Sequence, residues 1–139
     1  MATELLATQM LVALCLAAPP ARLPANLLAN PGFGKVFTDH MALATWTTEA
    51  GWHDAQVRAY GPLALDPAAS VLHYGQEIFE GLKAYRRPDG HINLFRPWEN
   101  ALRFNRSAER MAMAQVDPED HVEAIAELVR LEHEWVPAQ

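Results

Sequence analysis

Residues 82–95, LKAYRRPDGHINLF, combine two strand-like runs with a strong turn signal. The runs Leu82–Arg87 and His91–Phe95 flank Pro88-Asp89-Gly90. Proline presets one backbone angle of a tight reversal, and glycine accepts the positive angles that most other residues avoid. The stretch therefore predicts a β-hairpin.

Two further strands are predicted before this hairpin. β-Branched and aromatic residues accumulate over Lys35–Thr48, which favours a strand, and Glu49-Ala50-Gly51 is typical of a turn. Trp52–Tyr60 can then return as an antiparallel strand. A short helix is expected over Ala68–Tyr74, because Asp66-Pro67 suits a capped first turn.

Two helices are predicted after the hairpin. The first begins at Pro97, and the second follows Asp117, a residue type that caps helix N-termini. Apolar residues recur at helical spacing in the second helix and give it one apolar face: Val122, Ile125, Leu128, Val129 and Trp135. Strands followed by helices indicate an α+β fold, with antiparallel strands and flanking helices, rather than a doubly wound sheet.

Composition excludes several classes of protein. The chain has 139 residues, half of them hydrophobic, and a formal net charge of −6. An acidic domain of this size is expected to be globular and not to bind nucleic acid, since phosphate backbones attract clustered basic residues. The single cysteine, Cys15, excludes an intramolecular disulfide, and the dispersed histidines predict no metal site.

The N-terminal segment is apolar over Leu5–Ala18. It is too short and too interrupted to span a bilayer, so no membrane association is expected. Glu4 precedes it, with no lysine or arginine, whereas a signal peptide needs a positive leader. An N-terminal helix and a cytoplasmic location are therefore the expectation, and a cleaved signal peptide is the alternative.

Three arginines share one side of the predicted helix after Pro97: Arg103, Arg106 and Arg110. Spacing alone favours a solvated face with Glu99 and Glu109 as partners, because surface ion pairs are common. The alternative is one guanidinium turned inward to hold a phosphate through its fixed fork of donors. Periodicity does not decide between the two interpretations.

Aromatic residues recur in HYGQEIFEGLKAY, at Tyr74, Phe79 and Tyr85. Aromatic residues at such intervals most often pack in a core. The alternative is an apolar pocket wall with a phenol at its edge, as many small-ligand sites have. Nearby Glu77 and Glu80 would form a carboxylate pair if the stretch were helical, but no nucleophile stands beside them.

Longer segments resemble a known family. They are NPGFGKVFTDHM (residues 30–41), LDPAASVLHYGQEIFEGLKAYR (65–86), LFRPWENALRFNRSAERMAM (94–113) and EHEWVP (132–137). In order and spacing they resemble the N-terminal part of branched-chain amino acid aminotransferases, which are class IV pyridoxal-phosphate enzymes. The resemblance implies that residues 28–139 form the small domain of the D-amino-acid-aminotransferase-like fold. Residues 1–27 are unmatched and are expected to be helical or disordered.

The resemblance assigns roles to four residues. Arg103, in RPWENALR, matches the arginine that binds the phosphate of pyridoxal 5′-phosphate in this family. Tyr74 and Phe79, in LHYGQEIF, match residues that line the substrate side-chain pocket, as does Phe33 in GFGKVF. An apolar wall suits leucine, isoleucine and valine, which offer only hydrocarbon to recognise. No residue of the chain matches a catalytic one.

The family reaction passes the amino group of a branched-chain amino acid to 2-oxoglutarate in a homodimeric enzyme. It needs a lysine that binds the cofactor as a Schiff base. Neither Lys35 nor Lys83 matches that lysine, which is expected in a larger C-terminal domain beyond residue 139. The sequence is therefore expected to be an N-terminal fragment, inactive alone.

Two alternatives stay open at this point. The first is a non-catalytic small-domain protein that associates with full-length aminotransferase subunits. The second is a piece of a D-amino acid aminotransferase or an aminodeoxychorismate lyase, since these share the fold. The arm FGKVFTDHM and the wording HYGQEIFEGLKAYR favour the branched-chain members.

Overall fold

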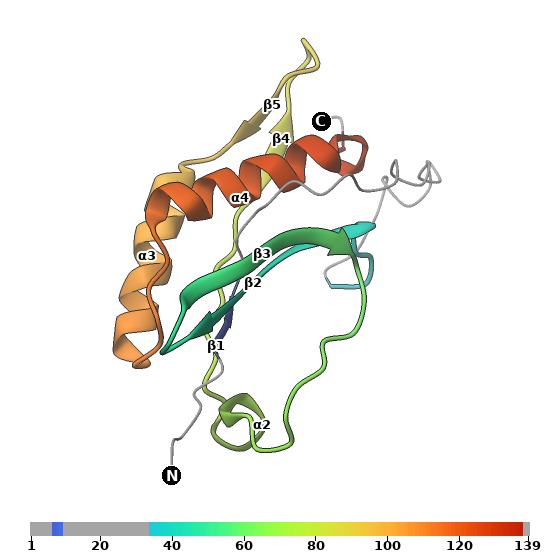
Figure 1. Cartoon of the computed structure of the whole chain (residues 1–139). Helices are drawn as coiled ribbons and strands as arrows, with labels where there is room; N and C mark the ends of the chain where they lie inside the picture. Colours follow the sequence, from blue (N-terminus) through green and yellow to red (C-terminus); the bar gives the residue numbers. More distant parts are fainter. Residues whose placement is uncertain (1–6, 10–33, 138–139) are drawn as a thin grey trace.

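The computed structural model describes residues 7–9, as backbone only, and residues 34–137. Two small antiparallel sheets and a layer of helices build an α+β architecture (Figure 1). The helix Pro118–Leu131 lies along the larger sheet, and the helix Pro97–Arg110 packs against it to one side. The smaller sheet projects beyond them. A long connection with little regular structure runs between the two sheets.

The larger sheet has the order β1-β2-β3. β1 spans Ala7–Gln9, β2 His40–Thr47 and β3 Gly51–Ala59, all antiparallel neighbours. Burial alternates along the first half of β2, as it must when one strand face is covered and the other is not. The turn at residues 48–50 and the return strand are confirmed as predicted.

Two expectations for the N-terminal half need correction. The strand predicted over residues 35–48 begins only at His40, because Phe37 leaves the ladder and stacks on Tyr60 with ring centroids 5.0 Å apart. In the apolar N-terminal segment a helix was expected, but Ala7–Gln9 pairs with β2 as a strand. The remainder of residues 1–27 lies outside the described part of the chain.

The short helix α2 spans Ser70–Tyr74, two residues shorter than predicted. Asp66 does accept a backbone hydrogen bond, from Ala68 N at 2.7 Å, but this bond closes the turn before the helix and does not cap it. Gly75 ends the helix in the left-handed conformation, which a glycine adopts without steric cost.

The hairpin prediction is confirmed. β4 (Ala84–Arg86) and β5 (Ile92–Leu94) pair antiparallel as a separate two-stranded sheet. Gly90, with φ of 86°, donates a backbone hydrogen bond to Arg87 across the turn. The strands are shorter than the predicted runs, although Arg87 N still donates to His91 O, at 2.7 Å, next to the turn.

Both C-terminal helices form where they were predicted. α3 spans Pro97–Arg110 and α4 spans Pro118–Leu131, followed by the 3₁₀ turn η1 at His133–Trp135. Asp117 caps α4 by accepting from Glu119 N at 2.8 Å. The expected apolar face of α4 is only half-buried, and Trp135 belongs to η1 rather than to the helix.

Small side chains form the centre of the described fold. The buried hydrophobic residues are mostly alanines: Ala42, Ala44, Val57, Ala101, Ala108, Val116 and Ala124. Alanine lets a helix approach a sheet or another helix closely, so α4 lies tightly against β2 and α3. Large apolar side chains are instead widely exposed, including Phe79, Tyr74 and Trp98.

A buried hydrogen-bonded pair joins the end of α4 to the start of β2. Glu132, just after α4, accepts from the backbone N and meets the ring Nδ1 of His40 at the start of β2, both at 2.7 Å. Both residues are almost fully buried. The pair therefore fixes the first residue of the strand against the last turn of the helix.

We expect His40→Ala to lower the free energy of unfolding by about 1–3 kcal/mol, the usual cost of leaving a buried polar partner short of a hydrogen bond. Urea unfolding followed by circular dichroism measures the change. His73→Ala is the matched control, because His73 is exposed and bonds only a nearby backbone carbonyl. Equal effects of the two variants would contradict a stabilising role for the pair.

Candidate functional site

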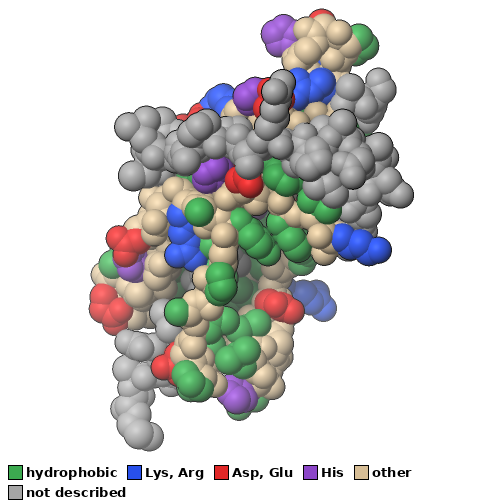
Figure 2. Space-filling view, turned by 90° about the vertical axis from the view of Figure 1, so that its right-hand side faces the viewer, with side chains coloured by type: hydrophobic (Ala, Val, Ile, Leu, Met, Phe, Trp, Pro, Cys, Tyr) green, Lys and Arg blue, Asp and Glu red, His purple; other side chains and the backbone are tan. Residues whose placement is uncertain are grey.

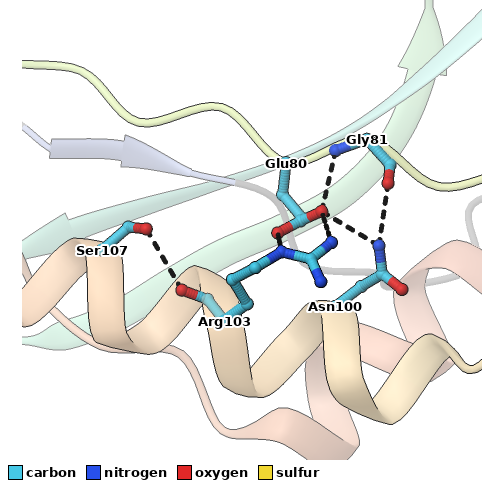
Figure 3. A network of polar contacts seen from close by, with 5 residues as sticks. All are labelled: Glu80, Gly81, Asn100, Arg103 and Ser107. Atoms are coloured by element: carbon cyan, nitrogen blue, oxygen red, sulfur yellow. Dashed lines mark hydrogen bonds and ion pairs between the residues drawn. The ribbon is translucent and has the colours of Figure 1, made fainter.

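Arg103 lies in the middle of α3 and faces the long connection between the sheets. Its Nε donates to Oε2 of Glu80 at 2.8 Å, and its Nη2 donates to Oε1 of the same carboxylate (Figure 3). The arginine side chain is 53% exposed, whereas that of Glu80 is 11% exposed. The guanidinium is thus held from one side and open to solvent on the other.

The Glu80 carboxylate accepts hydrogen bonds from two chain segments. Asn100, one turn before Arg103 on α3, donates from Nδ2 to Oε1 at 2.9 Å, and the following Gly81 N donates to Oε1 at 3.0 Å. Burial opposes ionisation of this carboxyl, but hydrogen bonds from Arg103 and Asn100, with the charge of Arg103, outweigh it and lower the pKa of Glu80. The carboxylate is therefore negative at neutral pH.

The solvated-face interpretation, which included Arg96 beside these arginines, holds for Glu99 but not for Arg103. Glu99 pairs with Arg96, at 3.4 Å, instead of with Arg103. The partner of Arg103 is Glu80, 23 positions away. Arg106 and Arg110 are exposed, as the solvated-face interpretation expects.

A cavity of 770 Å³ opens beside this network. It is bounded by β2, by α3 and α4, and by the long connection before β4, and its lining includes Leu43, Leu63, Val71, Ile78, Phe104 and Ile125. Hydrophobic side chains gather across the face that carries this connection (Figure 2). Glu80, Asn100 and His121 supply polar groups at the lining.

The expected substrate-wall residues are only partly brought together. Phe79 lines the cavity and directly precedes Glu80, so it lies close to the arginine network, although it is 85% exposed. Tyr74, at the end of α2, is 86% exposed and is not part of the lining. Phe33 lies outside the described residues.

His121 is a cavity residue that no sequence pattern indicated. It is buried in the first turns of α4 and meets Phe104 edge to face, with ring centroids 4.8 Å apart. Burial lowers the pKa of His121, although the charge of Glu80 acts in the opposite direction. A neutral imidazole is therefore favoured at the polar end of the cavity.

The histidines that could be considered for a metal site have other partners in the fold. His40 is engaged by Glu132, and His73 Nε2 lies 2.7 Å from the carbonyl oxygen of Pro67. Within residues 7–9 and 34–137, no group of three or more metal-ligating side chains comes together. In the same part of the chain, no helix has the length and apolar character needed to cross a bilayer.

This chain is similar to several branched-chain-amino-acid aminotransferases. A probable branched-chain-amino-acid aminotransferase of Streptomyces coelicolor is 55% identical over 114 residues, which is 82% of this chain and 32% of that protein. This chain belongs to the branched-chain-amino-acid aminotransferase family. It spans about a third of the length of the curated relatives it matches.

Two further family members are similar to this chain over most of its length. The branched-chain-amino-acid aminotransferase of Mycolicibacterium smegmatis is 54% identical over 112 residues, covering 81% of this chain and 30% of that protein. The branched-chain-amino-acid transaminase 1 of Bacillus subtilis is 52% identical over 108 residues, covering 78% and 30%. No family model matches the chain.

Glu80 is expected to stabilise the fold of this chain in a pH-dependent way. Its pKa is lowered in the fold, so its contribution is present above the ordinary glutamate value of 4.5 and is lost as the pH falls through the folded-state value. The stability gap between wild type and Glu80→Gln should therefore narrow as the pH falls from 7 to below 4.5.

Urea unfolding at a series of pH values measures this gap. Glu77→Gln is the matched control, because Glu77 belongs to the same connection but is exposed. A gap for Glu80→Gln that is constant with pH, or no larger than the gap for Glu77→Gln, would show that the Glu80 carboxylate adds no stability to the fold.

Proposed function

We propose that this chain supplies the small-domain part of a branched-chain amino acid transaminase, which moves the amino group of leucine, isoleucine or valine to 2-oxoglutarate with pyridoxal 5′-phosphate. The observation that carries the proposal is identity above 50% over about four fifths of the chain to family members bearing that activity in their names. The geometry around Arg103 supports it.

Arg103 fits a phosphate ligand. Its Nε and Nη2 edge is occupied by Glu80, and its half-exposed guanidinium retains further N–H donors toward solvent. Arginine forks bind phosphate oxygens with two parallel hydrogen bonds, which fix orientation as well as adding energy. We therefore assign Arg103 to the cofactor phosphate, the role that the family resemblance implies.

The residues around Arg103 would hold and surround the reacting groups. When bound, pyridoxal phosphate supplies the electron sink that makes amino transfer feasible. Phe79 presents ring surface at the cavity and directly precedes Glu80, whereas Tyr74 lies exposed at the end of α2. With Phe33, we assign both residues to the wall that meets the aliphatic substrate side chain. Apolar walls also exclude water from a site of charge transfer.

The exposed apolar face is consistent with a further covering surface. Large hydrophobic side chains such as Leu63, Leu65 and Phe79 are open to solvent along the same connection. Exposed patches of this kind mark interfaces with other protein surfaces. We propose that a second aminotransferase domain and a second subunit of a cytoplasmic homodimer cover this face.

A segment exchange tests the proposed function directly. We expect that replacing the matched 112 residues of the Mycolicibacterium smegmatis relative with those of this chain preserves leucine to 2-oxoglutarate transfer, measured as glutamate formation. In the hybrid, Arg103→Ala should lower kcat/KM by about tenfold or more, the usual range for a charged phosphate contact. Arg106→Ala is the control.

A folded hybrid that binds pyridoxal phosphate but transfers no amino group from leucine would overturn the assignment. An equal effect of the Arg103 and Arg106 substitutions would remove Arg103 from the cofactor site. Both outcomes require that circular dichroism shows a folded protein.

The chain by itself is expected to give no turnover with leucine, 2-oxoglutarate and pyridoxal phosphate. Its lysines are Lys35 and Lys83, both exposed, and neither lines the cavity beside Arg103. A lysine that moves the substrate proton has to lie at the reacting carbon. Sustained glutamate formation by the purified chain, lost in Lys83→Arg, would contradict this expectation.

A further inference from the structure

One edge of the Arg103 guanidinium is hydrogen-bonded to Glu80, and the other edge is not. Figure 3 shows that Nε and Nη2 both point to the Glu80 carboxylate, while the third nitrogen, Nη1, makes no drawn contact. A guanidinium carries five N–H donors, of which a side-on carboxylate takes two. The Nη1 and Nη2 edge therefore keeps a second parallel pair of donors, the arrangement that a phosphate group needs.

Residues other than Arg103 also hold Glu80 in place. Asn100 Nδ2 binds both Glu80 Oε1, at 2.9 Å, and the carbonyl oxygen of Gly81, at 2.8 Å. The same connection is attached again just after the end of α3, where Gln76 Nε2 donates to the carbonyl oxygen of Met111 at 2.9 Å. The carboxylate is thus fixed in space before any ligand arrives.

The carboxylate also links the two halves of the site. Phe79, which lines the cavity, precedes Glu80 directly, and Arg103 stands on the helix opposite. A shift of the connection moves the aromatic ring and the arginine partner together. The Glu80 carboxylate is therefore one of the contacts that set the distance between the apolar wall and the phosphate anchor.

We propose that Glu80 is a positioning residue that locks the plane of Arg103 and presents the free guanidinium edge to a phosphate ester. The inference rests on the proposed function of Arg103 as phosphate anchor. An arginine side chain loses several rotatable bonds when it is immobilised, and prior immobilisation by Glu80 removes that cost from binding. The opposite role, in which Glu80 occupies Arg103 and competes with phosphate, predicts the reverse change in affinity.

Ligand binding to this chain separates the two roles. The probe is pyridoxamine 5′-phosphate, which has no aldehyde to react with Lys35 or Lys83, and pyridoxamine is the comparison without phosphate. We expect Glu80→Gln to weaken binding of the probe by about threefold to tenfold, the range for one long side chain that must be ordered on binding. Isothermal titration calorimetry at fixed salt measures Kd.

Glu99→Gln is the matched control for charge. It removes the same negative charge from the neighbourhood of Arg103 but breaks no hydrogen bond to it, because Glu99 pairs with Arg96. Its Kd should equal or slightly improve on that of the wild type. Asn100→Ala, which loosens Glu80 without touching Arg103, should weaken binding in the same direction as Glu80→Gln.

A spectroscopic measurement reports the positioning without any ligand. Exchange of the Arg103 Nε proton with water, followed by NMR, should be slow in the wild type, several-fold faster in Glu80→Gln and unchanged in Glu99→Gln. In the wild type it should stay slow when the probe is added, since the probe takes the other edge. Loss of this protection on adding the probe would show that phosphate displaces Glu80 and would overturn the inference.

The remaining outcomes distinguish the inference from the proposed function. Binding in Glu80→Gln that is as tight as wild type, or tighter, while Arg103→Ala abolishes it, overturns the positioning role and leaves the phosphate anchor in place. Equal binding by Arg103→Ala and wild type overturns the anchor itself. Tighter binding of the phosphate compound than of pyridoxamine, lost in Arg103→Ala and weakened in Glu80→Gln, supports both.

Discussion

The carboxylate of Glu80 is the constraint on which the described site depends. It lies in a long connection with only one short helix, so backbone hydrogen bonding does little to fix this segment. Donors from Arg103, Asn100 and Gly81 compensate for taking the carboxylate out of water, and a buried carboxylate needs such partners. With the hydrogen bond from Gln76 to Met111, these contacts hold the connection and its aromatic residues against α3.

The carboxylate of Glu132 also joins two separate parts of the fold. Glu132 joins the end of α4 to the start of β2 through His40, so the helix layer and the sheet keep a fixed offset. Between these two polar attachments the layers meet through alanines, such as Ala44, Ala108 and Ala124. Alanine contacts allow close approach but give little directional preference, so the polar pairs determine the register of the layers.

Local sequence signals predicted the helices and strands well, but they did not predict contacts between residues that are far apart in the sequence. The hairpin at residues 82–95 and the cap at Asp117 were predictable because their chemistry lies within a few neighbouring residues. The start of β2 at His40 was not, since Phe37 leaves the strand for a ring stack with Tyr60. Glu80 and Arg103 stand 23 positions apart with no shared periodicity, so only the folded chain identifies their contact. Family resemblance selected Arg103 but indicated neither Glu80 nor His121.

The exposed aromatic residues of the long connection lower the solubility of the chain but provide the surface that we assign to substrate recognition. Tyr74 and Phe79 are almost fully open to water, so replacing them with polar residues would make this chain easier to keep in solution. The same replacements would erase the hydrocarbon surface that we assign to substrate recognition. A laboratory selection for well-expressed variants would therefore enrich chains that have lost this apolar surface, even though their fold and their arginine network are intact.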